Sequence, residues 1–82
     1  LAEIYEGMAR QHSYRLTDDA RVALKSVIER IFAKRDANFG NARVMRTLFE
    51  ATIEQQAIRI GEAESAPVDG IEASDIEFAA GV

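Results

Sequence analysis

The sequence lacks cysteine, contains a single histidine and a single proline, and has no long apolar run. Without cysteine, neither disulfides nor thiolate metal sites can support the fold. The lone His12 cannot form a metal site by itself. No apolar stretch approaches the length of a membrane span, and no signal peptide is visible. We therefore expect a cytoplasmic protein without a membrane contact and without a bound metal.

Length and composition predict one small domain that spans residues 1–82. Hydrophobic residues make up 48% of the chain, which is enough to form a thin core and argues against bulk disorder. The chain begins at Leu1 rather than at a methionine. We therefore expect it to be a fragment of a longer protein.

Charge is distributed unevenly along the chain. Residues 1–60 carry all ten Lys and Arg residues and eight acidic residues, whereas residues 61–82 carry six acidic residues and no basic one. The net charge is −4, and a net acidic chain is repelled by phosphate backbones. We therefore expect no nucleic-acid partner. The acidic C-terminal segment could instead aid solubility or meet a basic partner.

Helical periodicity recurs along the chain and predicts four helices. The first covers residues 1–12. The second begins after Thr17, a good N-cap residue followed by two acidic residues, and ends near Arg35. The third begins at Asn41 and runs to about Gly61, and a last short helix lies within 71–80 with Glu72 or Ser74 as its cap.

Each predicted helix carries an apolar stripe that should form the core, and no strand alternation is long enough for a sheet. The predicted fold class is therefore all-α, a small bundle of three main helices plus a short C-terminal helix. Its predicted inward-facing residues are Leu1, Ile4, Tyr5, Met8, Ala20, Leu24, Val27, Ile28, Ile31, Met45, Leu48, Phe49, Thr52, Ile53, Ala57, Ile60, Ile76 and Phe78, with Val22 and Phe32 at the margin.

One local conflict marks a candidate site at the start of the third helix. Arg43 lies in its first turn and Arg46 follows one turn later, where the helix dipole is already positive. A basic residue there costs about 0.3–1 kcal/mol relative to an acidic one. A bound phosphate would remove the conflict, and Gly40 would let the backbone approach it closely. A surface arginine paired with an acidic residue such as Asp36 is the alternative.

Other polar residues are weaker candidates for chemistry. Glu50 and Glu54 lie one turn apart, but Arg46 and Glu50 are also spaced for a solvated ion pair. His12 ends the first helix and fits a capping role better than catalysis. The pair Gln55–Gln56 is expected to provide surface and interface amides. Tyr5, Phe32, Phe39 and Phe49 are more typical of core or loop anchors than of ligand-stacking groups.

The segment Asn38–Glu50, followed by Gln56–Arg59, carries a recognisable phrase. It resembles "NFGNAR-x-x-R-N-L-F-E…Q-A-x-R", which opens the long lid helix in the CbbX and stage V sporulation protein K group of AAA+ ATPases. Thr47 departs from the usual Asn. Weaker similarities extend the resemblance over nearly the whole chain, at Ile4–Ala9, Tyr14–Thr17 and Ile71–Ile76.

The resemblance implies a function for the site. Arg43 matches the sensor-2 arginine, which reaches the γ-phosphate of ATP held mainly by a larger upstream domain. Phe39, Gly40, Asn41, Ala42 and Arg46 would complete the lid's side of the nucleotide site. ATP and Mg²⁺ would bind the full-length protein and not the fragment, which alone should not hydrolyse ATP. The implied partners are the larger domain, neighbouring subunits of a hexameric ring, and a protein to be remodelled.

Two other functions stay open on the residues alone. A stand-alone helical interaction module would use the acidic tail or the third helix as its docking surface. A small nucleic-acid binder would use Arg43, Arg46 and the basic end of the second helix, against the acidic balance of the chain.

Overall fold

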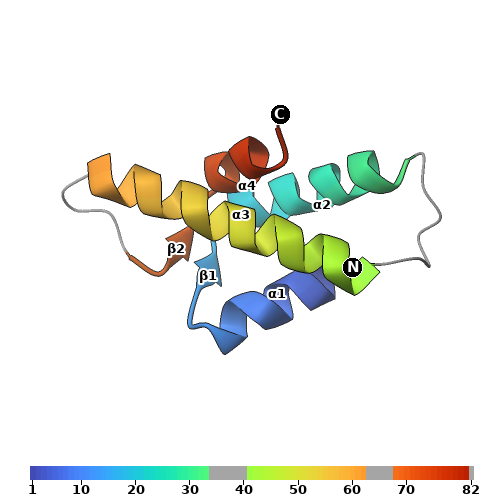
Figure 1. Ribbon diagram of the computed structural model, residues 1–82, viewed down its shortest axis with the longest axis horizontal. Coiled ribbons are helices and arrows are strands. Elements are labelled where there is room, and N and C mark those ends of the chain that lie inside the picture. The colour runs from blue at the N-terminus through green and yellow to red at the C-terminus, as the bar shows by residue number, and fades with distance from the viewer. Residues whose placement is uncertain (34–40, 63–67, 82) are drawn as a thin grey trace.

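The computed structural model describes residues 1–33, 41–62 and 68–81. Four helices and two short strands are described, and helices dominate (Figure 1). They are α1 (Ala2–Gln11), β1 (Arg15–Leu16), α2 (Asp18–Phe32), α3 (Asn41–Glu62), β2 (Gly70–Ile71) and α4 (Ala73–Ala79). The predicted all-α bundle is therefore confirmed. The expected end of the second helix at Lys34 and Arg35 lies outside the described residues.

Two helix starts show how side chains fix the boundaries. Thr17 is the N-cap of α2, as predicted, and its hydroxyl accepts a hydrogen bond from the backbone N–H of Ala20 at 3.1 Å. At α4, the structure selects Glu72 rather than Ser74 as the N-cap. The Asp75 carboxylate accepts the backbone N–H of Glu72 at 2.9 Å, which is one arm of a capping box.

A short parallel strand pair was not predicted from the sequence. Arg15 and Leu16 of β1 lie opposite Gly70 and Ile71 of β2. The expectation of no sheet is therefore wrong. Two-residue strands are too short to show an alternation of apolar and polar residues in the sequence. The pair ties the connector between α1 and α2 to the C-terminal segment.

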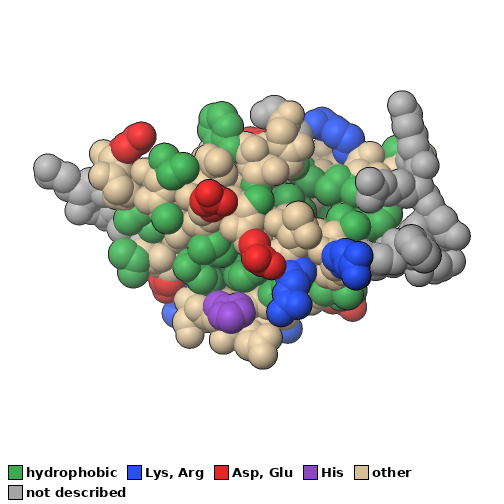
Figure 2. All heavy atoms as spheres, in the orientation of Figure 1, with side chains coloured by type: hydrophobic (Ala, Val, Ile, Leu, Met, Phe, Trp, Pro, Cys, Tyr) green, Lys and Arg blue, Asp and Glu red, His purple; other side chains and the backbone are tan. Residues whose placement is uncertain are grey.

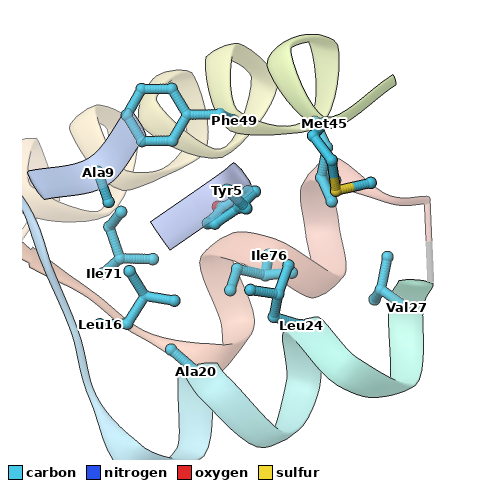
Figure 3. Close-up of a cluster of buried hydrophobic side chains, with 11 residues drawn as sticks. Tyr5, Ala9, Leu16, Ala20, Leu24, Val27, Met45, Phe49, Ile71 and Ile76 are labelled. Atoms are coloured by element: carbon cyan, nitrogen blue, oxygen red, sulfur yellow. The ribbon is translucent and has the colours of Figure 1, made fainter. Parts of the chain in front are cut away.

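The core lies where α1, α2 and α4 meet the long helix α3. In Figure 1, α3 crosses the molecule, with α1 on one side and α2 and α4 on the other. α4 packs against both α2 and α3, and α1 packs against α3. Figure 3 shows the side chains from all four helices and both strands converging between them. The buried cluster consists of Tyr5, Ala9, Leu16, Ala20, Leu24, Val27, Met45, Leu48, Phe49, Ile71 and Ile76.

Four inward assignments are corrected by the structure, and the first is Ile4 of α1, which is 39% exposed. Phe78 is 68% exposed, because α4 is a single short helix whose packed face is taken by Ile76, two residues away and on the opposite side. Val22 is 71% exposed on the outer face of α2. Ala57 is exposed, and the buried position on that turn of α3 belongs to Gln56.

Candidate functional site

The first turn of α3 presents a cation at the positive end of the longest helix. α3 begins at Asn41, and Ala42 and Arg43 that follow are both exposed. This first turn contains no acidic residue, whereas the first turns of α1, α2 and α4 contain Glu3, Asp18 with Asp19, and Asp75 respectively. Among the described residues, no ion pair includes Arg43. Arg43 is thus an exposed cation at a site of positive potential, and Asp36, the alternative partner predicted from the sequence, lies outside the described residues.

Arg46 lies one turn further along α3 and is only loosely paired. Its Nε is 3.8 Å from Oε1 of Glu50, and both side chains are at least 70% exposed. The predicted solvated ion pair between Arg46 and Glu50 is confirmed. Glu50 is therefore a partner of Arg46 rather than a member of an acid–base pair with Glu54. Figure 2 shows basic side chains over the start of α3 and acidic ones further along the helix.

Two shallow hollows lie on either side of Arg43. One, of about 380 Å³, is lined by Arg43, Ala42 and Arg46 of α3 and by Ile4 and Met8 of α1. The other, of about 360 Å³, lies between α3, the end of α2 and the end of α4. It is lined by Arg43, Val44, Thr47, Leu48, Ala51, Ile31, Ala79 and Ala80. Arg43 thus lies on a ridge between two largely apolar surfaces.

The structure brings together only part of the predicted nucleotide-binding set. Ala42, Arg43 and Arg46 line one hollow at the start of α3. Phe39 and Gly40 lie outside the described residues, as does the side chain of Asn41. Their predicted roles therefore stay predictions.

A separate aromatic group surrounds Phe49. The Phe49 ring lies 5.5 Å from Tyr5, 5.8 Å from His12 and 6.1 Å from Tyr14, measured between ring centroids. Phe49 is buried and its edge-on contacts are typical of core packing. His12 occupies the C-cap of α1, where its backbone N–H donates to the carbonyls of Met8 and Ala9. The interpretation of Tyr5 and Phe49 as core residues is supported, and Phe39 lies outside the described residues.

The structure shows one polar cluster that sequence reasoning missed. Arg59 binds Asp75 with two hydrogen bonds, Nε to Oδ1 at 2.9 Å and Nη2 to Oδ2 at 3.0 Å. Its Nη1 donates to Glu72 Oε2 at 3.1 Å and its Nη2 to the Gly70 carbonyl at 2.9 Å. Hydrogen bonding to Asp75 raises the pKa of the Arg59 guanidinium above its ordinary value. Asp75 is only 2% exposed, so this pair joins α3 to α4 inside the domain.

Gln56 belongs to the same cluster. It was expected at the surface, but only 2% of it is exposed. Its Nε2 donates to the carbonyls of Val68 at 2.8 Å and Gly70 at 3.2 Å. We call Gln56, Arg59 and Asp75, with the backbone that they hold, the C-terminal anchor. The spacing of the sequence could have indicated the burial of Gln56, because Gln56 follows the buried residues Phe49 and Thr52 at helical intervals.

The fold and site define a class of protein: a small helical domain with a solvent-facing arginine at the start of its longest helix. The family model of the AAA lid domain matches residues 1–81, and the chain belongs to that family. Lid domains of this kind are parts of AAA+ ATPases, which usually act with other domains and subunits. Searches of curated proteins and of solved structures found no match. Among the described residues, no helix is both long and apolar enough to cross a membrane.

Proposed function

We propose that this lid belongs to an AAA+ ATPase of the CbbX and stage V sporulation protein K group, and that Arg43 is its sensor-2 arginine. In this role, Arg43 contacts the γ-phosphate of ATP, which is held with Mg²⁺ mainly by the larger domain. The observation that carries the proposal is the exposed position of Arg43 in a first helical turn that lacks any acidic residue.

The charge order along α3 supports an anionic ligand at this end. Arg43 and Arg46 stand at the start, while Glu50, Glu54 and Glu62 follow toward the carboxyl end. At the start of α3 this order opposes the helix dipole and costs stability, whereas the last turn contains Arg59, whose positive charge is favoured there. A triphosphate fits the first turn, because it would meet free backbone N–H groups, the positive end of the dipole and a guanidinium together.

The neighbouring residues would complete the lid's side of the site. Ala42 is small and exposed, so it leaves room beside Arg43, and Arg46 adds a second positive charge at the same hollow. Phe39, Gly40 and Ala42 would lie near the adenine or ribose side, as the resemblance implies. When bound, ATP supplies a phosphoanhydride bond whose cleavage takes place in the larger domain.

Arg43 then works as the sensing end of a lever. Its charge-assisted hydrogen bonds would hold the lid against the larger domain while the γ-phosphate is present, and they would be lost when that acceptor leaves. The lid would then pivot relative to the larger domain. In a hexameric ring, such pivoting would pass to the next subunit and drive the remodelling of a partner protein.

Substitution of Arg43 in the full-length ATPase tests the proposal. We expect Arg43→Ala to lower ATP turnover by about a hundredfold, as is typical when one positioned donor to a developing charge is removed. Arg10→Ala is the matched control, because Arg10 is also an exposed arginine but lies at the end of α1. It should leave turnover unchanged.

Normal turnover in Arg43→Ala would remove the sensor role. The alternative, a stand-alone helical interaction module, predicts instead that the natural protein has no ATPase domain before this one. Circular dichroism of the 82-residue variant separates the two causes of lost turnover. Because Arg43 is exposed, the variant should keep its helical signal.

A further inference from the structure

Two side chains, one turn apart on α3, form hydrogen bonds to the backbone of residues 68–70. Gln56 donates to the carbonyls of Val68 and Gly70, and Arg59 donates to the Gly70 carbonyl as well. The Gly70 carbonyl therefore accepts two hydrogen bonds from α3, at 3.2 Å from Gln56 and 2.9 Å from Arg59. Side chains of α3 therefore hold the start of β2, in addition to its pairing with β1.

The same arginine fixes the start of α4. Both oxygens of Asp75 are bound by the Arg59 guanidinium, and Oδ2 also accepts the backbone N–H of Glu72. Glu72 in turn accepts from Arg59 through its own carboxylate at 3.1 Å. The first turn of α4 can therefore shift relative to α3 only if several hydrogen bonds to one planar group are broken together.

The proposed phosphate sensor and this anchor stand on one uninterrupted helix. Arg43 and Arg59 both belong to α3, which runs unbroken from Asn41 to Glu62. At the helical rise per residue, the two positions are about 24 Å apart along the axis. A displacement of the first turn would thus move the anchor residues of α3 by a similar amount. It would move α4 as well, as long as the hydrogen bonds of the anchor stay intact.

We propose that Gln56 and Arg59 are positioning residues that join residues 68–79 to α3, so that α4 follows α3 when Arg43 engages phosphate. The inference rests on the proposed function of Arg43. It goes further by naming the contact through which the sensing end of α3 acts on α4. The surface carried by α4 includes the exposed Phe78, which lines a hollow with Ile58 of α3.

The anchor adds a fixed orientation to a segment that is also held by apolar burial and strand pairing. Ile71 and Ile76 are fully buried in the core, and β2 is paired with β1. Apolar burial already draws the segment inward without fixing its orientation on α3. A planar guanidinium bound to three acceptor groups adds that orientation, which a lysine at the same place could not reproduce.

The proposal can be tested through the thermodynamic coupling between nucleotide binding at Arg43 and opening of residues 70–79. If opening of residues 70–79 away from α3 disturbs the Arg43 site, then a nucleotide bound there must slow that opening. Hydrogen exchange of residues 70–79 is measured in the full-length protein with and without adenylyl imidodiphosphate, a non-hydrolysable ATP analogue. We expect the analogue to slow exchange in the wild-type protein by about fivefold or more.

Arg59→Lys is the principal variant. It keeps the positive charge but loses the two-point contact with Asp75. We expect protection of residues 70–79 by the analogue to fall below about twofold, while affinity for the analogue stays within about twofold of wild type. Arg21→Lys is the matched control: Arg21 also pairs with two acids, Glu6 at 3.0 Å and Asp18 at 3.5 Å, but away from the anchor. It should keep full protection.

Gln56→Met decides the outcome if Arg59→Lys loses its helical signal. Methionine preserves the buried volume and removes only the two hydrogen bonds to Val68 and Gly70. The proposal predicts that protection is weakened in this variant also.

Unchanged protection in the folded anchor variants would overturn the proposal and leave the sensor role standing. If the analogue does not protect residues 70–79 in the wild-type protein, the proposal is also overturned. The sensor role still stands in that case if Arg43→Ala lowers turnover as expected. Normal turnover in Arg43→Ala would instead remove the function on which the proposal rests.

Discussion

The two ends of α3 place the same side chain in opposite surroundings. Arg43 stands in the first turn, exposed, at the end of the helix where its charge is disfavoured. Arg59 stands in the last turn, where a positive charge is favoured, and its side chain is only 21% exposed. It binds two carboxylates and a carbonyl. Among the described residues, local electrostatics therefore explains Arg59 but not Arg43, and this difference is the argument for a ligand at Arg43.

The first way to break this comparison is to remove each arginine from the 82-residue chain. Arg59→Ala leaves the buried Asp75 carboxylate without its partner, so we expect a loss of about 3–5 kcal/mol in the free energy of unfolding. Arg43→Ala should change that free energy by less than about 0.5 kcal/mol, as exposed substitutions usually do. Urea denaturation of both variants provides the measurement. Equal losses would mean that Arg43 is also a structural residue.

The second prediction concerns Tyr5, which lies under α3 between its two ends. Tyr5 is fully buried, and burial raises the pKa of its phenol well above the ordinary value. The unfolded chain releases this proton near pH 10, whereas the folded chain keeps it. The stability contributed by neutral Tyr5 is therefore complete below that pH and is lost as the pH rises above it, by about 1.4 kcal/mol per pH unit.

Tyr5→Phe provides the control for this pH dependence. Among the described residues, the buried Tyr5 hydroxyl forms no hydrogen bond. Its removal therefore leaves no other polar group without a partner. The variant should be at least as stable as wild type at pH 7 and should lose the alkaline slope due to residue 5. Urea midpoints at pH 7, 10 and 11 distinguish the two chains. An unchanged slope would mean that Tyr5 ionises in the folded state.

The same contrast shows what the sequence could reveal. Arg43 was found from the sequence because its conflict is local: a cation within one turn of a helix start can be read from neighbouring residues. The helices were predictable for the same reason, because caps such as Thr17 and apolar stripes are local patterns. Sequence reasoning could thus locate the exposed end of α3 and the helices that surround it.

The C-terminal anchor was not predictable in this way, because its partners are 11 to 16 residues apart in sequence. Gln56 has the composition of a surface residue, and only the fold brings backbone carbonyls to its amide. Asp75 appeared as one of six acidic residues in the tail, and nothing local marks it as the buried one. The two-residue strands that hold the segment in place lie below the length that periodicity can detect.

The third prediction sharpens the comparison by reversing the charge at the start of α3. Arg43→Glu places an acidic residue where the other helices already have one, so we expect the 82-residue chain to gain about 0.3–1 kcal/mol at low salt. The same change in the full-length protein should abolish nucleotide-dependent activity. Thermal unfolding at low and high salt measures the gain, which salt should diminish. A loss of stability instead would show that Arg43 has a stabilising partner within the domain.

The smallest expected effect lies at Arg46 and Glu50, between the two ends of α3. Their side chains are 75% and 70% exposed, their closest atoms are 3.8 Å apart, and the arginine precedes the glutamate, which is the less favourable order on a helix. A double-mutant cycle with Arg46→Ala and Glu50→Ala should therefore give a coupling of at most about 0.5 kcal/mol, which moderate salt should remove. A salt-resistant coupling above about 1 kcal/mol would contradict this expectation. Arg46 would then be held within the domain as Arg59 is, and only Arg43 would remain as a cation for the nucleotide.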